Sequence, residues 1–290
     1  MQLEGRRRSS NVEDRRSGGL GKGALLALPA GCGTVLTLGL GVVLLLLGVE
    51  PREVLRIVQD PQLQRAMDQL EAQPGMSQGQ EDGLADFASA VLADTEDTWG
   101  QLFAERGGHY EAPVLVLFSG SVRSACGAAG AEVGPFYCPG DHKAYIDLTF
   151  FDDLEHRYGA PGDFAQAYVL AHEIGHHVQT ITGISGEVRQ AQRGMSQVEA
   201  NALSVKLELQ ADCYAGVWGH HAARKGLLSE GDMREGLTAA SAIGDDRLQR
   251  QARGTVTPES FTHGSSEQRT RWLRIGLESG TPEACDTFTP

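Results

Sequence analysis

The sequence feature that most constrains this chain is the run A-H-E-I-G-H-H at residues 171–177, which contains the pattern H-E-x-x-H. Residues four apart share one face of an α-helix, so His172 and His176 can bind the same ion if this segment is helical. Glu173 then lies beside the ion, where its carboxylate can take a proton from a water molecule. The apolar residues at 168–170 predict a buried helix. Burying a glutamate in such a helix costs free energy, so its presence there indicates a function. The pattern therefore predicts a zinc site with Glu173 as catalytic base.

A catalytic zinc site needs a third protein ligand and one open position. The segment E-L-Q-A-D at residues 208–212 places two carboxylates one turn apart on a second, largely apolar helix. We expect Glu208 to complete a site for one Zn²⁺, and Asp212 to accept a hydrogen bond from a zinc-bound histidine. Direct ligation by Asp212 stays open as the reverse assignment. The alternative interpretation is a solvated pair of acids on a helix face.

Hydrolysis of a peptide bond also needs a donor for the negative charge that develops on the carbonyl oxygen. His263 lies in a Gly/Ser-rich turn just before a predicted helix, and we assign it this catalytic role. A helix cap or an outer hydrogen-bonding role is the alternative for such a histidine. Arg269 is predicted to orient Glu208 or Asp212 through a bidentate ion pair.

Several segments carry a resemblance to a known family. They are G-P-F-Y-C-P at 134–139, G-D-F-A-Q-A-Y at 162–168, H-E-I-G-H-H-V-Q at 172–179, E-L-Q-A-D-C at 208–213 and S-N-V-E-D-R-R at 10–16. They resemble the bacterial "putative neutral zinc metallopeptidase" family of single-pass membrane proteins, and the two site motifs are similar to those of the gluzincin peptidases. The resemblance covers nearly the whole chain and implies a zincin-like peptidase fold with a bound zinc ion.

A stretch from residue 23 to residue 49 contains no charged side chain. About 20 apolar residues suffice to span a bilayer, whereas the apolar part of a cleaved signal peptide, the alternative, is shorter. The flanking cations precede the stretch, which places the N-terminus in the cytoplasm by the positive-inside rule. We expect a single-pass anchor in the bacterial cell membrane, with residues 1–22 as a flexible cytoplasmic tail. The remaining body would then be periplasmic or extracellular.

The number of cysteines outside the apolar stretch is consistent with an oxidising compartment. Outside the apolar stretch the chain has Cys126, Cys138, Cys213 and Cys285, an even number that suggests two disulfides. Cys126 and Cys138 flank a glycine-rich loop that a local bridge can close, which would leave the other two as a pair. Three pairings are nevertheless possible, and four buried free thiols are the alternative.

The charge excludes one large class of partners. Six of the 25 Lys and Arg residues and three of the 38 Asp and Glu residues precede residue 50, which leaves 19 cations against 35 acids. Nucleic acid would repel such a body, because binding relies on neutralising phosphates. No P-loop or G-x-G-x-x-G pattern occurs. The G-x-S-x-G match at 75–79 lies in the predicted linker and follows no predicted strand, so it is not the strand-to-helix turn of a serine hydrolase. A peptide or protein is the expected substrate, and the oligomeric state stays open.

Periodicity predicts an α+β fold, with a mainly helical metallopeptidase-like domain and a small sheet over residues 82–290, after a linker or stalk at 50–81. We expect strands at 114–118 and 144–148, and helices near 84–102, 150–158, 163–182, 196–223, 229–253 and 265–278. Two other functions compete with a peptidase: a catalytically silent envelope interaction protein with the same fold, and a zinc amidase acting on cell-wall peptides. The presence of Glu173 favours an enzyme over the silent protein.

Overall fold

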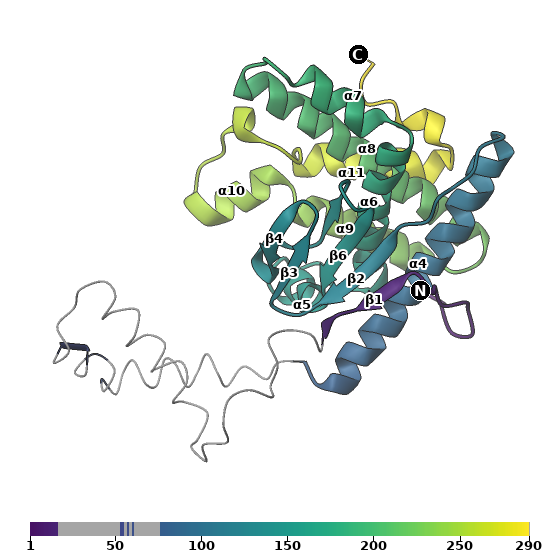
Figure 1. Ribbon diagram of the computed structural model, residues 1–290, viewed down its shortest axis with the longest axis horizontal. Coiled ribbons are helices and arrows are strands. Elements are labelled where there is room, and N and C mark those ends of the chain that lie inside the picture. The colour runs from purple at the N-terminus through teal and green to yellow at the C-terminus, as the bar shows by residue number, and fades with distance from the viewer. Residues whose placement is uncertain (17–52, 55–56, 58–59, 61–75, 290) are drawn as a thin grey trace. The chain divides into compact units, whose positions relative to one another are not determined.

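The computed structural model describes residues 1–16, 53–54, 57, 60 and 76–289 (Figure 1). The chain divides into a unit formed by residues 1–19 and 82–290 and another formed by residues 20–81. The predicted membrane span at 23–49 and most of the predicted linker lie outside the described residues. Within the described part, no helix is long and apolar enough to cross a membrane.

A four-stranded sheet forms the base of the larger unit, in the order β1-β2-β6-β5 (Figure 1). Its strands are β1 (Val12–Asp14), β2 (Val114–Phe118), β5 (Phe136–Cys138) and β6 (Lys143–Asp147). β2 pairs in parallel with both β1 and β6, and β5 runs antiparallel to β6. β2 is apolar throughout because it lies between two strands with its side chains largely buried on both faces. Strands β2 and β6 confirm the two strands predicted from the sequence.

The N-terminal segment differs from its prediction. The sequence predicts a flexible tail over residues 1–22, but the described residues 1–16 are an ordered part of the larger unit. The Leu115 amide donates to the Asn11 carbonyl at 2.8 Å, and the Arg15 amide donates to the Leu117 carbonyl at 2.8 Å. A polar composition hides this pairing, because the strand bonds through its backbone to an edge formed 100 residues later in the chain.

The helices confirm a mainly helical α+β domain. They are α4 (Gln78–Glu105), α5 (Thr149–His156), α6 (Asp163–Ile181), α7 (Ile184–Ala191), α8 (Gln197–Arg224), α9 (Glu230–Ala242), α10 (Asp245–Arg253) and α11 (Ser266–Ser279). α6 contacts β5 and β6 on the sheet side and packs against α8 and α9 elsewhere on its surface, while α11 packs on α8 and α9. α6 thus lies between the sheet and the other helices.

One predicted helix is wrong in its extent. The sequence predicts continuous helix over 229–253, but α9 ends at Ala242 and α10 begins at Asp245. The break lies at Gly244, where an added Cβ would lie 2.3 Å from the Ser266 backbone nitrogen. The break therefore lies where the first residue of α11 packs closely against the chain, a tertiary contact that local helix propensity does not reveal.

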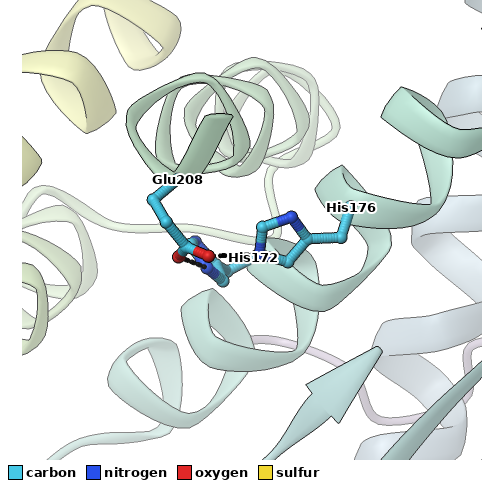
Figure 2. A group of neighbouring side chains, drawn as sticks. All are labelled: His172, His176 and Glu208. Atoms are coloured by element: carbon cyan, nitrogen blue, oxygen red, sulfur yellow. Dashed lines mark hydrogen bonds and ion pairs between the residues drawn. The ribbon is translucent and has the colours of Figure 1, made fainter. Parts of the chain in front are cut away.

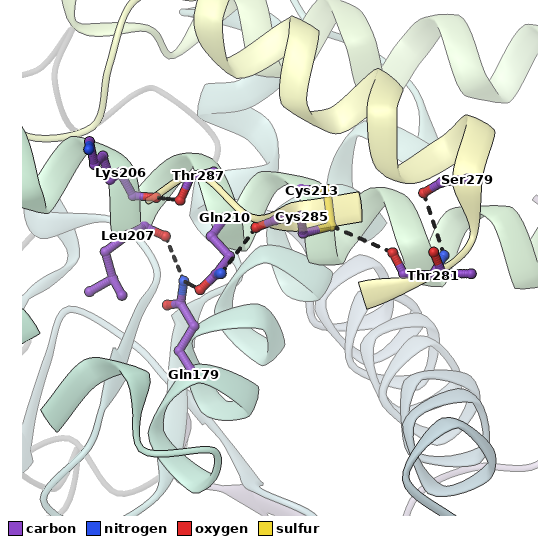
Figure 3. Close-up of a disulfide and its surroundings, with 9 residues drawn as sticks. All are labelled: Gln179, Lys206, Leu207, Gln210, Cys213, Ser279, Thr281, Cys285 and Thr287. Carbon is purple, nitrogen blue, oxygen red and sulfur yellow. Dashed lines mark hydrogen bonds between the residues drawn. A yellow bond between two sulfur atoms is a disulfide. The ribbon is translucent and has the colours of Figure 1, made fainter. Parts of the chain in front are cut away.

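Disulfides fix two parts of the fold. Cys126, between β3 (Ser121–Ser124) and β4 (Gly127–Gly130), is bonded to Cys138 at the end of β5. Cys213 of α8 is bonded to Cys285 in the C-terminal segment (Figure 3). Of the three possible pairings, the structure therefore has the one with the local bridge.

Candidate metal centre

Three side chains from two helices converge on one point (Figure 2). His172 and His176 project from one face of α6, and Glu208 reaches them from α8. Glu208 Oε2 lies 3.2 Å from His172 Nε2, and Glu208 Oε1 lies 3.4 Å from His176 Nε2. All three potential ligand atoms lie within 4.8 Å of one another. This group could therefore hold a metal ion.

The close approach of α6 and α8 makes this convergence possible. Gly175, between the two histidines, faces Ala211 on α8, and a Cβ at Gly175 would lie 2.9 Å from the Ala211 carbonyl oxygen. A side chain here would force the two backbones apart. Glycine at this position lets Glu208 span the gap between the helices.

The ring nitrogens that face away from Glu208 are both occupied. His172 Nδ1 lies 2.8 Å from Asp212 Oδ1, and His176 Nδ1 lies 2.9 Å from Gln179 Oε1. Both histidines therefore present Nε2 to the centre, as metal-binding histidines held by an outer hydrogen bond do. Two imidazoles and one carboxylate match the donor set of a catalytic zinc site with an open position.

Asp212 is the hub of a buried network behind His172. It is 0% exposed and accepts from Arg269 Nε and Nη2, each at 2.9 Å, and from the Tyr168 hydroxyl at 2.6 Å. Burial alone would raise the pKa of Asp212, but Arg269 and His172 lower it to about 2. Of the two carboxylates that Arg269 is predicted to orient, the one it contacts is Asp212.

A second chain of hydrogen bonds lies behind His176 (Figure 3). Gln179 Nε2 donates to the Leu207 carbonyl at 2.7 Å and to Gln210 Oε1 at 3.1 Å. Gln210 Nε2 in turn donates to the Cys285 carbonyl at 3.1 Å, beside the disulfide to α8. Sequence reasoning missed both glutamines, although Gln179 lies three residues after His176, a spacing that places neighbours on one helix face.

Glu173 lines a cavity of about 450 Å³ together with the three ligand candidates. The residue is 7% exposed, and its carboxylate forms no hydrogen bond within the described part of the chain. Burial raises the pKa of Glu173, and the neighbouring His172 and His176 partly oppose that rise. A carboxylate with a raised pKa and no fixed partner is suited to taking up and releasing a proton.

His263 lines the same cavity and is held there by Asp245 at the start of α10. Asp245 Oδ2 accepts from the backbone amides of Thr262, His263 and Gly264 at 2.8, 2.7 and 3.1 Å, and Asp245 Oδ1 lies 3.3 Å from His263 Nδ1. The hydrogen bond to Asp245 raises the pKa of His263. Sequence reasoning missed Asp245 because it placed this residue inside the continuous helix 229–253.

Other titratable groups lie apart from this centre. His177 faces away from it, with Nε2 2.6 Å from the Glu111 carbonyl oxygen and Nδ1 3.0 Å from the Tyr137 hydroxyl. A second group of ligand-type side chains in the described residues consists of Asp163, Asp232 and Glu235. It offers carboxylates alone, and the Met1 ammonium forms an ion pair with Asp163. Zinc sites favour nitrogen and sulfur donors, so the first group is the better candidate.

Known proteins resemble this chain over most of its length. Over 99% of both chains, the protein is 48% identical to "Uncharacterized protein YpfJ" of Escherichia coli K12. It is 46% identical over 191 residues to "Uncharacterized protein Rv2575" of Mycobacterium tuberculosis H37Rv, covering 62% of this chain and 64% of that one. No solved structure matches. A sequence profile described as "Putative neutral zinc metallopeptidase" matches residues 1–288, and the chain belongs to this family.

Proposed function

We propose that this protein is a zinc peptidase in which His172, His176 and Glu208 hold one Zn²⁺ and Glu173 acts as general base. The observation that carries the proposal is the convergence of two Nε2 atoms and one carboxylate beside a cavity that Glu173 also lines. When bound, zinc supplies Lewis-acid activation of water and polarisation of the scissile carbonyl. The imidazoles are already oriented for this by Asp212 and by Gln179.

The chain's own residues would carry the proton and the charge. Glu173 takes the proton of the attacking water and passes it to the nitrogen of the departing amine. His263 lines the same cavity and donates a hydrogen bond to the carbonyl oxygen as it becomes negative. Asp245 keeps the His263 ring in place and favours its protonated form.

Two features support an extended peptide as substrate. The cavity is lined by residues 133–137, which lead into and include most of β5, and by the rings of Phe150 and Tyr158. β5 is an edge of the described sheet, with β6 on one side. An edge strand can bind an extended chain through backbone hydrogen bonds, while nearby pockets take alternate side chains. We infer a peptide lying along β5, with its scissile bond between Glu173 and His263.

The first test is metal content. The full-length protein, purified in detergent without chelator, should contain one zinc per chain, and His172→Ala or Glu208→Ala should remove most of it. His156→Ala is the matched control, because this histidine is exposed on α5 and lies outside the cavity. Retention of full zinc by Glu208→Ala would refute the assigned ligand set.

The second test separates catalysis from metal binding. Digestion of a peptide library should stop when zinc is chelated, and Glu173→Gln should abolish cleavage while keeping the zinc content of the wild type. Inactive wild-type protein with full zinc would favour the silent interaction protein. Cleavage of cell-wall peptides, with no cleavage of the general library, would favour the zinc amidase.

A further inference from the structure

The N-terminal arm, defined as residues 1–16, is built into the body of the protein. Val12 and Asp14 pair with Leu115 and Leu117 of β2, and this pairing caps the sheet edge opposite β5 (Figure 1). Earlier in the arm, the Ser9 amide donates to the Ser89 carbonyl on α4 at 3.1 Å. The arm therefore contributes a strand and also lies against a long helix.

Side chains of the arm meet a matching surface on α4. Glu96 accepts from the Ser9 hydroxyl at 2.5 Å, from Asn11 Nδ2 at 2.8 Å and from Arg7 Nη2 at 2.9 Å. Its side chain is only 10% exposed, and its bonds to Ser9 and Asn11 are partly buried, whereas Arg7 is 47% exposed. Hydrogen bonds to a charged and shielded group are among the stronger ones in proteins.

The arginines of the arm are used in this docking. Arg7 also bonds Asp97 at 2.7 Å, and Arg8 bonds both carboxylate oxygens of Asp86, at 2.7 and 2.5 Å. Arg16 pairs with Asp82 at 3.1 Å in addition to an acid of the arm itself. By the positive-inside rule, cations that flank an apolar stretch lie in the cytoplasm. Here acids of α4 pair with three of these arginines, Arg7, Arg8 and Arg16.

We propose that residues 1–16 and the body at 82–290 fold in one and the same compartment, on the same side of any membrane. A single crossing would place some 30 Å of hydrocarbon between the arm and α4, which pairing between β1 and β2 cannot bridge. The disulfides of the body place this shared compartment outside the reducing cytoplasm. The proposal does not depend on zinc or on peptidase activity.

Thiol labelling in cells tests the shared compartment. In a Cys32→Ser background, Ser10→Cys marks the arm and Ala252→Cys marks the body; both positions are exposed. A membrane-impermeant maleimide should label both variants of the full chain in intact spheroplasts. Labelling of the body alone before lysis would overturn the proposal. Labelling of both only after lysis would keep the shared compartment and overturn its external placement.

Proteolysis of the purified full chain tests the docking itself. Glu96→Ala removes the acceptor of three arm groups, so trypsin should cleave the Arg6–Arg8 region about tenfold faster or more. Glu105→Ala is the matched control on the same helix, because Glu105 is exposed and, among the described residues, its carboxylate accepts a hydrogen bond from Gln101 alone. Equal cleavage rates in the two variants and the wild type would overturn the proposal.

Discussion

The sharpest prediction concerns the carboxylate behind His172. Asp212→Asn keeps the shape of the side chain but removes the charge that faces Arg269 and His172. Arg269 is 3% exposed, so its guanidinium would stay buried without a counter-ion. The substitution should therefore affect both the stability of the domain and the affinity of the centre for zinc, through two different contacts.

The expected losses of stability and of zinc affinity follow from the burial of Asp212 and from its contact with His172. Breaking a fully buried ion pair at one partner costs about 3–5 kcal/mol in the free energy of unfolding. Losing the outer partner of a metal-binding histidine weakens metal affinity roughly 10–100-fold, or about 1.4–2.7 kcal/mol. Asp153→Asn is the control, because Asp153 lies 3.9 Å from Arg157 and both side chains are half exposed. It should change stability by at most about 0.5 kcal/mol.

A double variant separates the two effects. Urea unfolding of the zinc-free protein gives the stability, and competition with a chelating dye gives the zinc dissociation constant. Asp212→Asn combined with Arg269→Leu removes the unpaired charge, so much of the lost stability should return while zinc affinity stays low. If Asp212→Asn binds zinc within about twofold of the wild type, Asp212 does not support the ligand His172, and our reasoning about the network is wrong.

Three further predictions test other contacts. Asp245→Asn removes the partner that raises the pKa of His263, so the alkaline limb of the kcat/KM profile should move to lower pH. Gly276→Ala should destabilise the domain by about 3 kcal/mol or more in thermal or urea unfolding, because the new Cβ would lie 2.0 Å from a carbonyl oxygen of α8. The control is Gly100→Ala, in open space within α4, which should be neutral or slightly stabilising. Cys285→Ser opens a bridge across 72 residues and should cost about 4 kcal/mol in urea unfolding.

The parts of the centre that could be predicted are those set by local geometry. Two histidines four residues apart share a helix face in any protein, and so do Glu208 and Asp212. The apolar residues around them indicate burial, and burial of a carboxylate calls for a partner. These rules predicted Glu208 as the third ligand and Asp212 as the partner of a histidine, with the reverse assignment left open, and the structure groups Glu208 with the two histidines.

The parts that could not be predicted depend on contacts between distant segments. Asp245 accepts hydrogen bonds from three backbone amides in the loop that contains His263. The sequence around Asp245 does not predict this contact. The pairing of the arm with β2 is likewise a backbone interaction, and backbone groups are the same for every sequence. The arginines of the arm did carry a signal, but positive charge alone does not distinguish a membrane-flanking cation from one that pairs with α4.

Gly175 belongs to the local motif, but its identity depends on a contact between distant segments. The pattern H-E-x-x-H leaves its position unspecified, because neither metal binding nor proton transfer needs a side chain there. The fold does specify it, since a Cβ at Gly175 would lie 2.9 Å from the Ala211 carbonyl oxygen of α8. That approach brings Glu208 to within 3.4 Å of both imidazoles, and it places Asp212, one turn further on, behind His172. The local motif therefore meets Glu208 in a fold where packing against α8 requires glycine at one of the positions that the motif leaves unspecified.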